Sequence, residues 1–544
     1  MSPWMSTVRP VVWSVAGNDS GAGAGLQADL RAFDACGVHG CTVVATLTAQ
    51  NSRAVQRVEA VSASMLDAQL AALAEDLRPR VIKTGLLGSA EAVQVLAGWV
   101  RRLRAQVPDQ PVALVLDPVW RASTGASMAG ESLRQALLSE LLPLATVITP
   151  NRAEAAWLLG RSSPLPEMAQ CLAQDLAQDL AALGPSSVVI TGGDGTGLGA
   201  DAEWACDWLH SAEASGWLFA PRLLAPHNHG TGCVFASTLA SALAHGFAVA
   251  DATVLAKMMV TDALRHGYAA GSGAGPVSPH IGFAARPENL PGFRPDELRH
   301  ALPMLAPPEA FAPERGLDLY AVVDSAAWVE RLARAGVRTV QLRLKPDVAL
   351  ARGVDLRVEI ARCVALQKRF DLKFYVNDHW ALAIEAGAYG VHVGQEDLDQ
   401  VDVAAIRHAG LRLGLSTHSL WELARAWALR PSYIACGPVH ATTTKDMPWQ
   451  PQGVHNLGWW RQMLPTLPVV GIGGFTPERL EAAARTGVDG LAVLSGITAA
   501  SDPEAAVQAY QDALRRGRSE AALVAPRWPR PSLRGRWGGE NTTA

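Results

Sequence analysis

The sequence predicts an α/β protein built from two domains. Short apolar runs alternate with helical patterns along most of the chain, and repeated units of this kind form parallel sheets covered by helices. The alternation is interrupted once, between Gly271 and Gly316, where prolines and glycines are dense. Proline removes N–H donors and glycine costs backbone entropy, so we interpret this stretch as a domain boundary.

Length and composition limit the classes of protein to consider. The 544 residues are 49% hydrophobic, with a formal net charge of −4, and at roughly 100–200 residues per domain they suffice for several domains. The near-neutral charge gives no reason to expect nucleic acid as a partner. We expect no membrane segment and no secretory signal, because no apolar run has the required length or flanks. Seven scattered cysteines without a CxxC pair are typical of a reducing cytoplasm.

We expect four regions along the chain. The first domain covers residues 1–283, a linker covers 284–316, and a second domain covers 317–515. A short helix over 295–302 is expected within the linker. Arginines and prolines alternate over 516–544, which favours a disordered basic tail.

The first domain opens with a strand, a glycine-rich turn and a helix. Residues 11–16 are apolar, 17–25 read GNDSGAGAG, and a helical pattern follows. Such a turn either brings backbone N–H groups to an anion or makes a tight crossover. Further strands are expected at 41–47, 80–84, 113–116, 146–148 and 187–191, helices at 65–77, 90–104, 130–141 and 168–183, and an antiparallel pair at 202–209 and 217–221 after a turn at 192–201.

The most informative stretch of this domain reads HGTGC, from His229 to Cys233, directly before a strongly helical run. Free N–H groups and the helix dipole stabilise negative charge at a helix N-terminus. A thiol there should have a lowered pKa and could act as a base. The alternative is a small cysteine packed under the sheet. His227 and His229 could suggest a metal, but no third ligand has a matching spacing.

The second domain contains eight apolar runs with helical patterns between them. Eight such units in about 200 residues predict a TIM (β/α)8 barrel, whose active site lies at the carboxyl ends of the strands. The runs lie at 319–324, 340–345, 374–378, 390–394, 411–418, 433–439, 469–474 and 490–496.

Polar residues and glycines fall at the ends of these runs. Two aspartates, Asp378 and Asp397, without histidine or cysteine partners suit Mg²⁺. An arginine and two lysines, Arg343, Lys345 and Lys445, suit a pyrophosphate, and glycines after the last two strands suit a terminal phosphate. A single residue of this kind could be a barrel-interior ion pair, but the whole set at one end predicts a ligand. The set is Gln341, Arg343, Lys345, Asn377, Asp378, Asp397, Ser416, Thr442, Thr443, Thr444, Lys445, Gly474 and Ser495.

Several motifs of the first domain together carry a family resemblance. They are AGNDSGAGAGLQADL, ATLTAQN, KTGLL, DPV, TPNRAEA and HGTGC. Over about residues 10–283 the chain resembles the hydroxymethylpyrimidine/phosphomethylpyrimidine kinases of thiamine biosynthesis, which implies a ribokinase-like fold and ATP as co-substrate.

The resemblance implies roles for individual residues of this domain. Asp29 and Gln50 would bind the aminopyrimidine, and Cys233 would deprotonate the substrate. The backbone of Gly230, Thr231, Gly232 and Cys233 would form an anion hole, and Asn151 and Glu154 would organise magnesium and phosphate. Thr191 stands where the family often has lysine, so a phosphate contact there is in question.

The second domain resembles thiamine-phosphate synthase over about residues 317–515, through QLRLK, VNDHWALA, GVHVGQEDL, LGLSTH, TTTK and VGIGG. In that family pyrophosphate leaves a pyrimidine diphosphate and a thiazole nitrogen captures the pyrimidine cation. Gln341, Arg343, Lys345, Asn377, Ser416 and Lys445 would bind the pyrimidine diphosphate, with Lys445 catalytic. Asp378 and Asp397 would hold Mg²⁺. Thr442, Thr443, Thr444, Gly474, Leu494 and Ser495 would bind thiazole phosphate.

The two resemblances imply a bifunctional enzyme with consecutive steps, acting on hydroxymethylpyrimidine, ATP and thiazole phosphate, without nucleic acid or membrane. A homo-oligomer is left open. The alternatives are a kinase for a pyridoxine-type vitamer, a barrel related to thiazole tautomerases, and a vitamin-binding regulator in which one half is not catalytic.

Overall fold

The computed structural model describes residues 8–120, 130–161, 169–193, 203–295, 308–442 and 448–533. The chain divides into two compact units, residues 1–306 with 533–544 and residues 307–532. In the described residues no helix has the length and apolarity needed to cross a bilayer.

The first unit is a ten-stranded sheet in the order β10-β9-β8-β7-β6-β5-β4-β1-β2-β3. Its centre, from β2 to β7, is parallel, and β3, β8, β9 and β10 are antiparallel to their neighbours. The strands are β1 (Val11–Gly17), β2 (His39–Gln50), β3 (Val55–Ala60), β4 (Val81–Thr84), β5 (Ala113–Leu116), β6 (Val147–Ile148), β7 (Val188–Ile190), β8 (Trp204–His210), β9 (Ser215–Pro221) and β10 (Gly292–Pro295).

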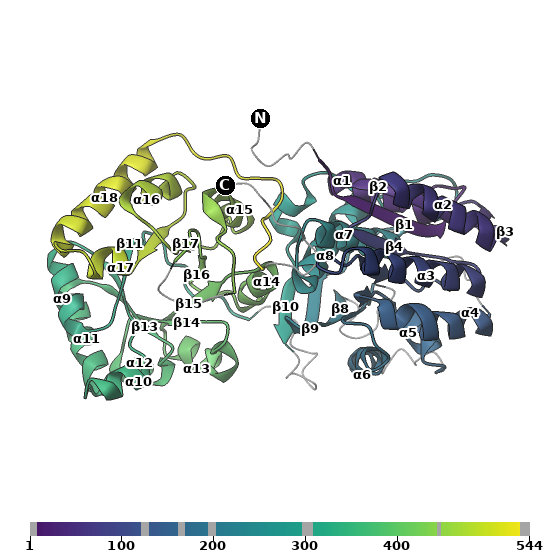
Figure 1. Ribbon diagram of the computed structural model, residues 1–544. Coiled ribbons are helices and arrows are strands. Elements are labelled where there is room, and N and C mark those ends of the chain that lie inside the picture. Colours follow the sequence, from purple (N-terminus) through teal and green to yellow (C-terminus); the bar gives the residue numbers. More distant parts are fainter. Residues whose placement is uncertain are drawn as a thin grey trace. The chain divides into compact units, whose positions relative to one another are not determined.

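Helices cover both faces of this sheet (Figure 1). On one side are α1 (Gly25–Ala35), α7 (Thr231–Ala244) and α8 (Val249–Arg265). The other side carries α2 (Ala63–Asp76), α3 (Ala90–Gln106), α4 (Glu131–Ala136), α5 (Arg152–Leu158) and α6 (Ala169–Ala181), together with the short helices η1 (Leu137–Leu141) and η2 (Leu142–Leu144). The predicted α/β class and the antiparallel β8–β9 pair are confirmed; most of the expected turn at 192–201 lies outside the described residues.

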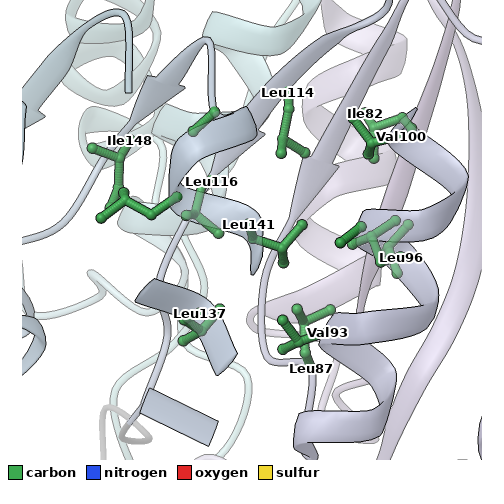
Figure 2. Packing of buried hydrophobic residues seen from close by; sticks show 14 of the residues in the cluster. Ile82, Leu87, Val93, Leu96, Val100, Leu114, Leu116, Leu137, Leu141 and Ile148 are labelled. Atoms are coloured by element: carbon green, nitrogen blue, oxygen red, sulfur yellow. The ribbon is translucent and has the colours of Figure 1, made fainter. Parts of the chain in front are cut away.

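Strand alternation divides the side chains of the sheet between the two helical layers. Figure 2 shows Ile82 of β4 beside Val100 of α3, and Leu116 of β5 beside Leu141 of η1, within one apolar cluster that also contains Leu114. Successive side chains of a strand point to opposite faces, so Lys83, next to Ile82, points toward the layer of α1 and α7. There it meets Asp29 of α1 at 2.9 Å. The same alternation thus builds an apolar core on one face and a buried ionic cluster on the other.

The second unit is a closed barrel of eight parallel strands, which confirms the predicted TIM barrel (Figure 1). The strands are β11 (Asp318–Val323), β12 (Thr339–Leu342), β13 (Lys373–Asn377), β14 (Gly390–Val393), β15 (Arg412–Thr417), β16 (Tyr433–Cys436), β17 (Val469–Ile472) and β18 (Gly490–Val493). The longer helices around them are α9 (Ala326–Arg334), α10 (Pro346–Ala351), α11 (Leu356–Phe370), α12 (Trp380–Ala386), α13 (Val403–His408), α14 (Leu420–Leu429), α15 (Gly453–Met463), α16 (Pro477–Ala484) and α18 (Pro503–Ser519), and α17 (Ser495–Thr498) is one turn long.

Both ends of the expected linker are parts of folded units. Residues 292–295 form β10, paired with β9, and Phe283 and Asn289 are buried ahead of it. On the other side, Phe311 and Glu314 are buried, and their N–H groups donate to the carbonyl oxygens of Arg430 and Ser432 at 2.9 and 3.0 Å. These contacts could not be predicted from composition, because proline and glycine also occur in short edge strands and in packed irregular segments. The helix expected at 295–302 lies almost entirely outside the described residues.

The expected basic tail is also structured over most of its length. Helix α18 continues to Ser519. The N–H of Arg530 donates to Asn456 Oδ1 at 2.8 Å, and the N–H of Gln450 donates to the carbonyl oxygen of Ser532 at 2.7 Å. Hydrogen bonds with the barrel unit therefore replace the expected disorder up to residue 532.

We predict that Leu96→Ala destabilises the first unit by about 2–5 kcal/mol, because Leu96 is fully buried between α3 and the sheet and truncation leaves a cavity. Urea unfolding followed by hydrogen exchange in peptides of the first unit measures the change. The matched control is Leu224→Ala, since Leu224 is 92% exposed. Equal effects of the two substitutions would contradict the assignment of the core.

Candidate active sites

In the first unit, the glycine-rich turn after β1 folds around the carboxylate of Asp19. That carboxylate accepts hydrogen bonds from the N–H groups of Gly21, Gly23 and Ala24 at 2.7–2.8 Å. His229 Nε2 lies 3.3 Å from the same carboxylate and joins this turn to the HGTGC stretch. The two loops named from the sequence, more than 200 residues apart, therefore form one surface.

Hydrogen-bond partners stabilise the ionised form of Asp19. Burial opposes its ionisation, but hydrogen bonds from His229, Gln50 and the backbone outweigh that effect and lower the pKa of Asp19 to about 2. Gln50, predicted to bind the pyrimidine, thus lies beside the turn. A contact of Gln50 with a substrate stays a prediction.

Helix α7 begins at this surface. Its N-cap, Gly230, has a φ of 87°, and an added Cβ would lie 2.3 Å from the carbonyl oxygen of Gly23. Glycine is therefore required by backbone conformation and by space. Among the described residues no side chain caps the helix, so the first-turn N–H groups of Thr231, Gly232 and Cys233 can serve an anion.

A buried ionic cluster lies below the start of α7. Lys83 and Asp29 are fully buried, and Lys83 Nζ lies 2.9 Å from Asp29 Oδ1 and 3.6 Å from Asp117 Oδ2. Asp29 also accepts hydrogen bonds from Ser14 at 2.5 Å and Ser237 at 2.7 Å. Both oxygens of Asp29 thus have protein partners, and its predicted contact with a pyrimidine stays a prediction.

The pKa of Cys233 shifts opposite to the sequence-based expectation. Burial raises it to about 12, the carboxylates of Asp29 and Asp117 add to the effect, and the ammonium of Lys83 opposes it. The expectation considered only the helix N-terminus and missed the carboxylates, which come from distant strands and helices. Cys233 is therefore a protonated thiol at neutral pH.

Asn151 and Glu154 form a capping box at the start of α5. Asn151 Oδ1 accepts from the N–H of Glu154, and Glu154 Oε2 accepts from the N–H of Asn151, both at 2.8 Å. The NxxE pattern therefore has a local structural role. Its predicted part in organising magnesium and phosphate stays a prediction. Thr191 bridges to Asn151 in the backbone ladder beside it.

In the second unit, a cavity opens at the carboxyl ends of the barrel strands, where the sequence placed the site. It has a volume of about 1310 Å³ when its open mouth is included. Eleven of the residues predicted for this domain line it, namely Gln341, Arg343, Lys345, Asn377, Asp378, Asp397, Ser416, Thr442, Gly474, Leu494 and Ser495. The predicted residues Thr443, Thr444 and Lys445 lie outside the described residues.

One side of this cavity combines cations and carboxylates. Lys345 Nζ lies 3.2 Å from Asp378 Oδ2, and Gln341 donates to Asn377 at 2.7 Å, while Asn377 in turn donates to Asp378. Burial and the neighbouring charge of Asp378 raise the pKa of Asp397. A divalent cation would relieve this repulsion, and an all-oxygen donor set suits Mg²⁺. The residues present therefore fit the predicted metal.

The floor of the cavity carries a chain of buried hydrogen bonds that sequence reasoning did not assign. Gln341 Oε1 accepts from Tyr320 at 3.1 Å, and the Tyr320 and Tyr433 hydroxyls are 2.7 Å apart. His392 links Tyr433 to Ser416, with its two ring nitrogens at 2.7 and 2.8 Å from their hydroxyls. Burial lowers the pKa of His392 to about 4. A neutral imidazole therefore fixes the hydroxyl of Ser416.

A signal for these residues existed in the sequence. Tyr320, His392 and Tyr433 sit at inward positions of strands 1, 4 and 6 of the barrel, within runs that were used only to count strands. A polar residue inside an otherwise apolar barrel strand needs a buried partner. Predicting the hydrogen bonds between these three residues would also have required the register of the barrel strands, which the sequence does not provide.

The two units thus have the features of two transferases: a helix N-terminus and glycine-rich turn suited to phosphoryl groups, and a barrel mouth suited to a diphosphate and a metal. Comparison with known proteins gives the same division. Residues 19–278 match the family model for phosphomethylpyrimidine kinase, and residues 319–497 match that for thiamine monophosphate synthase.

Individual relatives cover one unit each. The thiamine-phosphate synthase of Neisseria meningitidis is 52% identical over 195 residues, which are 36% of this chain and 93% of that protein. The Bacillus subtilis pyridoxal kinase solved with ADP is 30% identical, with 50% of this chain and 97% of that chain covered and a TM-score of 0.43. A phosphomethylpyrimidine kinase of Clostridium difficile is 29% identical, with 47% and 100% covered and a TM-score of 0.39.

The chain belongs to the thiamine-phosphate synthase family through its barrel. With the phosphomethylpyrimidine kinase domain ahead of that barrel, it is a bifunctional transferase of thiamine biosynthesis. The two families act on small molecules and use ATP and typically a divalent metal.

We predict that kinase kcat/KM rises with pH between about 7 and 9, close to tenfold per unit, if the Cys233 thiolate is the base. The pKa of this thiol is raised to about 12, so the thiolate fraction grows tenfold per unit below that value. Initial rates of ADP release measure this, with synthase activity on supplied diphosphate as the control for intact protein. A flat kinase profile would exclude thiolate formation as the limiting ionisation.

We predict that acid weakens the barrel through His392. Its folded pKa, about 4, lies below the ordinary 6.5, so the unfolded state takes up a proton first as pH falls from 6.5 to 4. The stability of the fold falls by about 3 kcal/mol over this window. Hydrogen exchange in β14 and β15 at pH 7.5 and 4.5 measures the loss. His392→Gln should reduce this acid-induced loss, and an unchanged loss would contradict the assignment.

Proposed function

We propose that the first unit transfers the γ-phosphoryl group of ATP to 4-amino-5-hydroxymethyl-2-methylpyrimidine, and then a second one to the monophosphate. In each transfer an O–P bond forms to the acceptor oxygen and the bond to the ADP leaving group breaks. Where the acceptor is the hydroxymethyl group, the Cys233 thiol first gives up its own proton to solvent, and the resulting thiolate takes the proton of the hydroxyl.

Three observations support the kinase roles. The uncapped start of α7 offers N–H groups to the transferring phosphoryl. Gln50 lies beside the glycine-rich turn and hydrogen-bonds Asp19, and Asp29 is held beneath Cys233 by Lys83. In this proposal Asp29 and Gln50 recognise the aminopyrimidine, and Asn151 and Glu154 serve the magnesium and phosphates of ATP.

We infer that the barrel joins the resulting diphosphate to thiazole phosphate. The bond between the pyrimidine methylene carbon and the diphosphate oxygen breaks, and its electron pair leaves with pyrophosphate. The thiazole nitrogen then supplies the pair for the new C–N bond, giving thiamine phosphate.

In this proposal the residues predicted for the barrel divide between the two substrates. Arg343, Lys345 and Lys445 neutralise the departing pyrophosphate, while Gln341 and Asn377 orient it. Ser416, fixed by His392, contacts the pyrimidine side. Thr442 to Thr444, Gly474, Leu494 and Ser495 hold thiazole phosphate. Asp378 and Asp397 would hold Mg²⁺, which supplies positive charge against the leaving pyrophosphate when bound.

The observation that carries the barrel proposal is the convergence of eleven predicted residues on one cavity. The direct test combines the purified chain with ATP, Mg²⁺, hydroxymethylpyrimidine and thiazole phosphate, and detects thiamine phosphate and pyrophosphate by mass spectrometry. Pyridoxine and pyridoxal in place of hydroxymethylpyrimidine test the other vitamer class. Faster phosphorylation of either than of hydroxymethylpyrimidine would overturn the kinase assignment.

We predict that two substitutions separate the activities. Cys233→Ala should remove kinase turnover and leave synthase activity on supplied diphosphate, while Asp378→Asn should slow the synthase at least about 100-fold and leave the kinase unchanged. Both rates are measured on each variant with saturating substrates. Loss of both activities in one variant would contradict two independent sites.

A further inference from the structure

The first unit contains a cluster of metal-ligating side chains that belongs to neither proposed reaction. Asp262 and His266 are four residues apart on α8 and at its end, so their side chains share one face. His280 comes from the irregular segment that follows. The ligand atoms of the three residues all lie within 4.8 Å of one another.

The spacing of these atoms is close to that of a metal site. His266 Nδ1 and His280 Nδ1 lie 3.7 and 4.0 Å from Asp262 Oδ2. Zinc ligands sit about 2.0–2.2 Å from the ion in a tetrahedron, which puts neighbouring ligand atoms about 3.4 Å apart. The two Asp262–histidine distances therefore need to shorten by only about 0.3 and 0.6 Å, and all three ligand atoms already lie within 4.8 Å of one another.

The cluster also leaves buried polar atoms without partners. The Asp262 side chain is fully buried, and among the described residues its Oδ2 has no hydrogen-bond partner; within the same residues the buried Nδ1 of His280 also lacks one. Such atoms cost free energy unless they are satisfied. Both belong to the group of atoms that gathers within 4.8 Å, so a cation bound among them would satisfy both.

The surroundings of Asp262 resemble an outer coordination shell. Its other oxygen, Oδ1, accepts from Arg286 at 2.5 Å and from Asn289 at 3.1 Å. Hydrogen bonds of this kind orient a ligating carboxylate. The guanidinium of Arg286 lowers the affinity for any cation, and His266 must give up a 2.8 Å hydrogen bond to the Asp262 carbonyl oxygen.

We propose that Asp262, His266 and His280 bind a divalent transition metal of the zinc type. Two imidazoles and one carboxylate favour such an ion over Mg²⁺, which prefers oxygen ligands. The histidine side chains are 38% and 43% exposed, so the ion reaches the site from solvent and keeps an open position there. Its effect is structural: it fastens the end of α8 to the segment that leads to β10.

The test measures Zn²⁺ binding to the full chain by calorimetry, after chelator treatment and in excess Mg²⁺ to fill oxygen-ligand sites. We expect one zinc per chain. His266→Ala and His280→Ala should each weaken it at least 10- to 100-fold, the loss known for an outer-shell partner. The control His39→Ala, an exposed histidine of the same unit, should bind like the wild type.

A second readout separates binding from misfolding. Zinc should raise the melting temperature of the first unit in the wild-type and His39→Ala chains and not in the other two variants. Kinase turnover with Mg²⁺ and ATP checks that each variant is folded. Absence of stoichiometric zinc in the wild type, or equal affinity in folded His280→Ala, would overturn the proposal.

Discussion

Parallel strands end at a common edge, and both active regions of this protein depend on that constraint. The position of a strand in the sheet therefore determines where the residue that follows the strand lies. In the first unit the glycine-rich turn after β1 and Asp117 after β5 arise in this way. In the barrel, eight strand ends deliver cations, carboxylates and glycines to one mouth. Residues that are far apart in the sequence are thereby brought to one site because each follows a strand.

Each site rests on a buried polar network that is almost fully satisfied. Lys83 would be costly beneath the kinase site without Asp29 and Asp117. In the barrel floor, Tyr320, Tyr433 and His392 form a chain of hydrogen bonds. The chain ends at Gln341 and Ser416, which line the cavity. Such networks fix rotamers, so the groups that we propose to bind substrate are held in place by the fold itself.

Prediction from sequence succeeded where position along a strand determines position in space. Asp378 and Gly474 needed only the strand count to be placed at the mouth. It failed where a role depends on groups far along the chain. The pKa of Cys233 is raised by burial and by two carboxylates, Asp29 of α1 and Asp117 after β5. The orientation of His392 depends on Tyr433. Strand β3 was missed because its side chains are nearly all exposed and carry no apolar alternation. The boundaries were misjudged because composition does not reveal the pairing of β10 or the docking of residues 520–532.

Strand β10 has a protective role beyond completing a sheet. Without β10, the N–H and C=O groups along that side of β9 would be unpaired and could bind a strand of another molecule. Strand β9 also contains the aromatic residues Trp217 and Phe219. Gly292 allows the close approach, since an added Cβ would lie 2.3 Å from the Phe219 ring. A kinase fragment that ends near residue 283 would therefore be aggregation-prone, whereas one carried through Pro295 ends its sheet with a four-residue strand that contains a proline, which offers a poorer template for pairing.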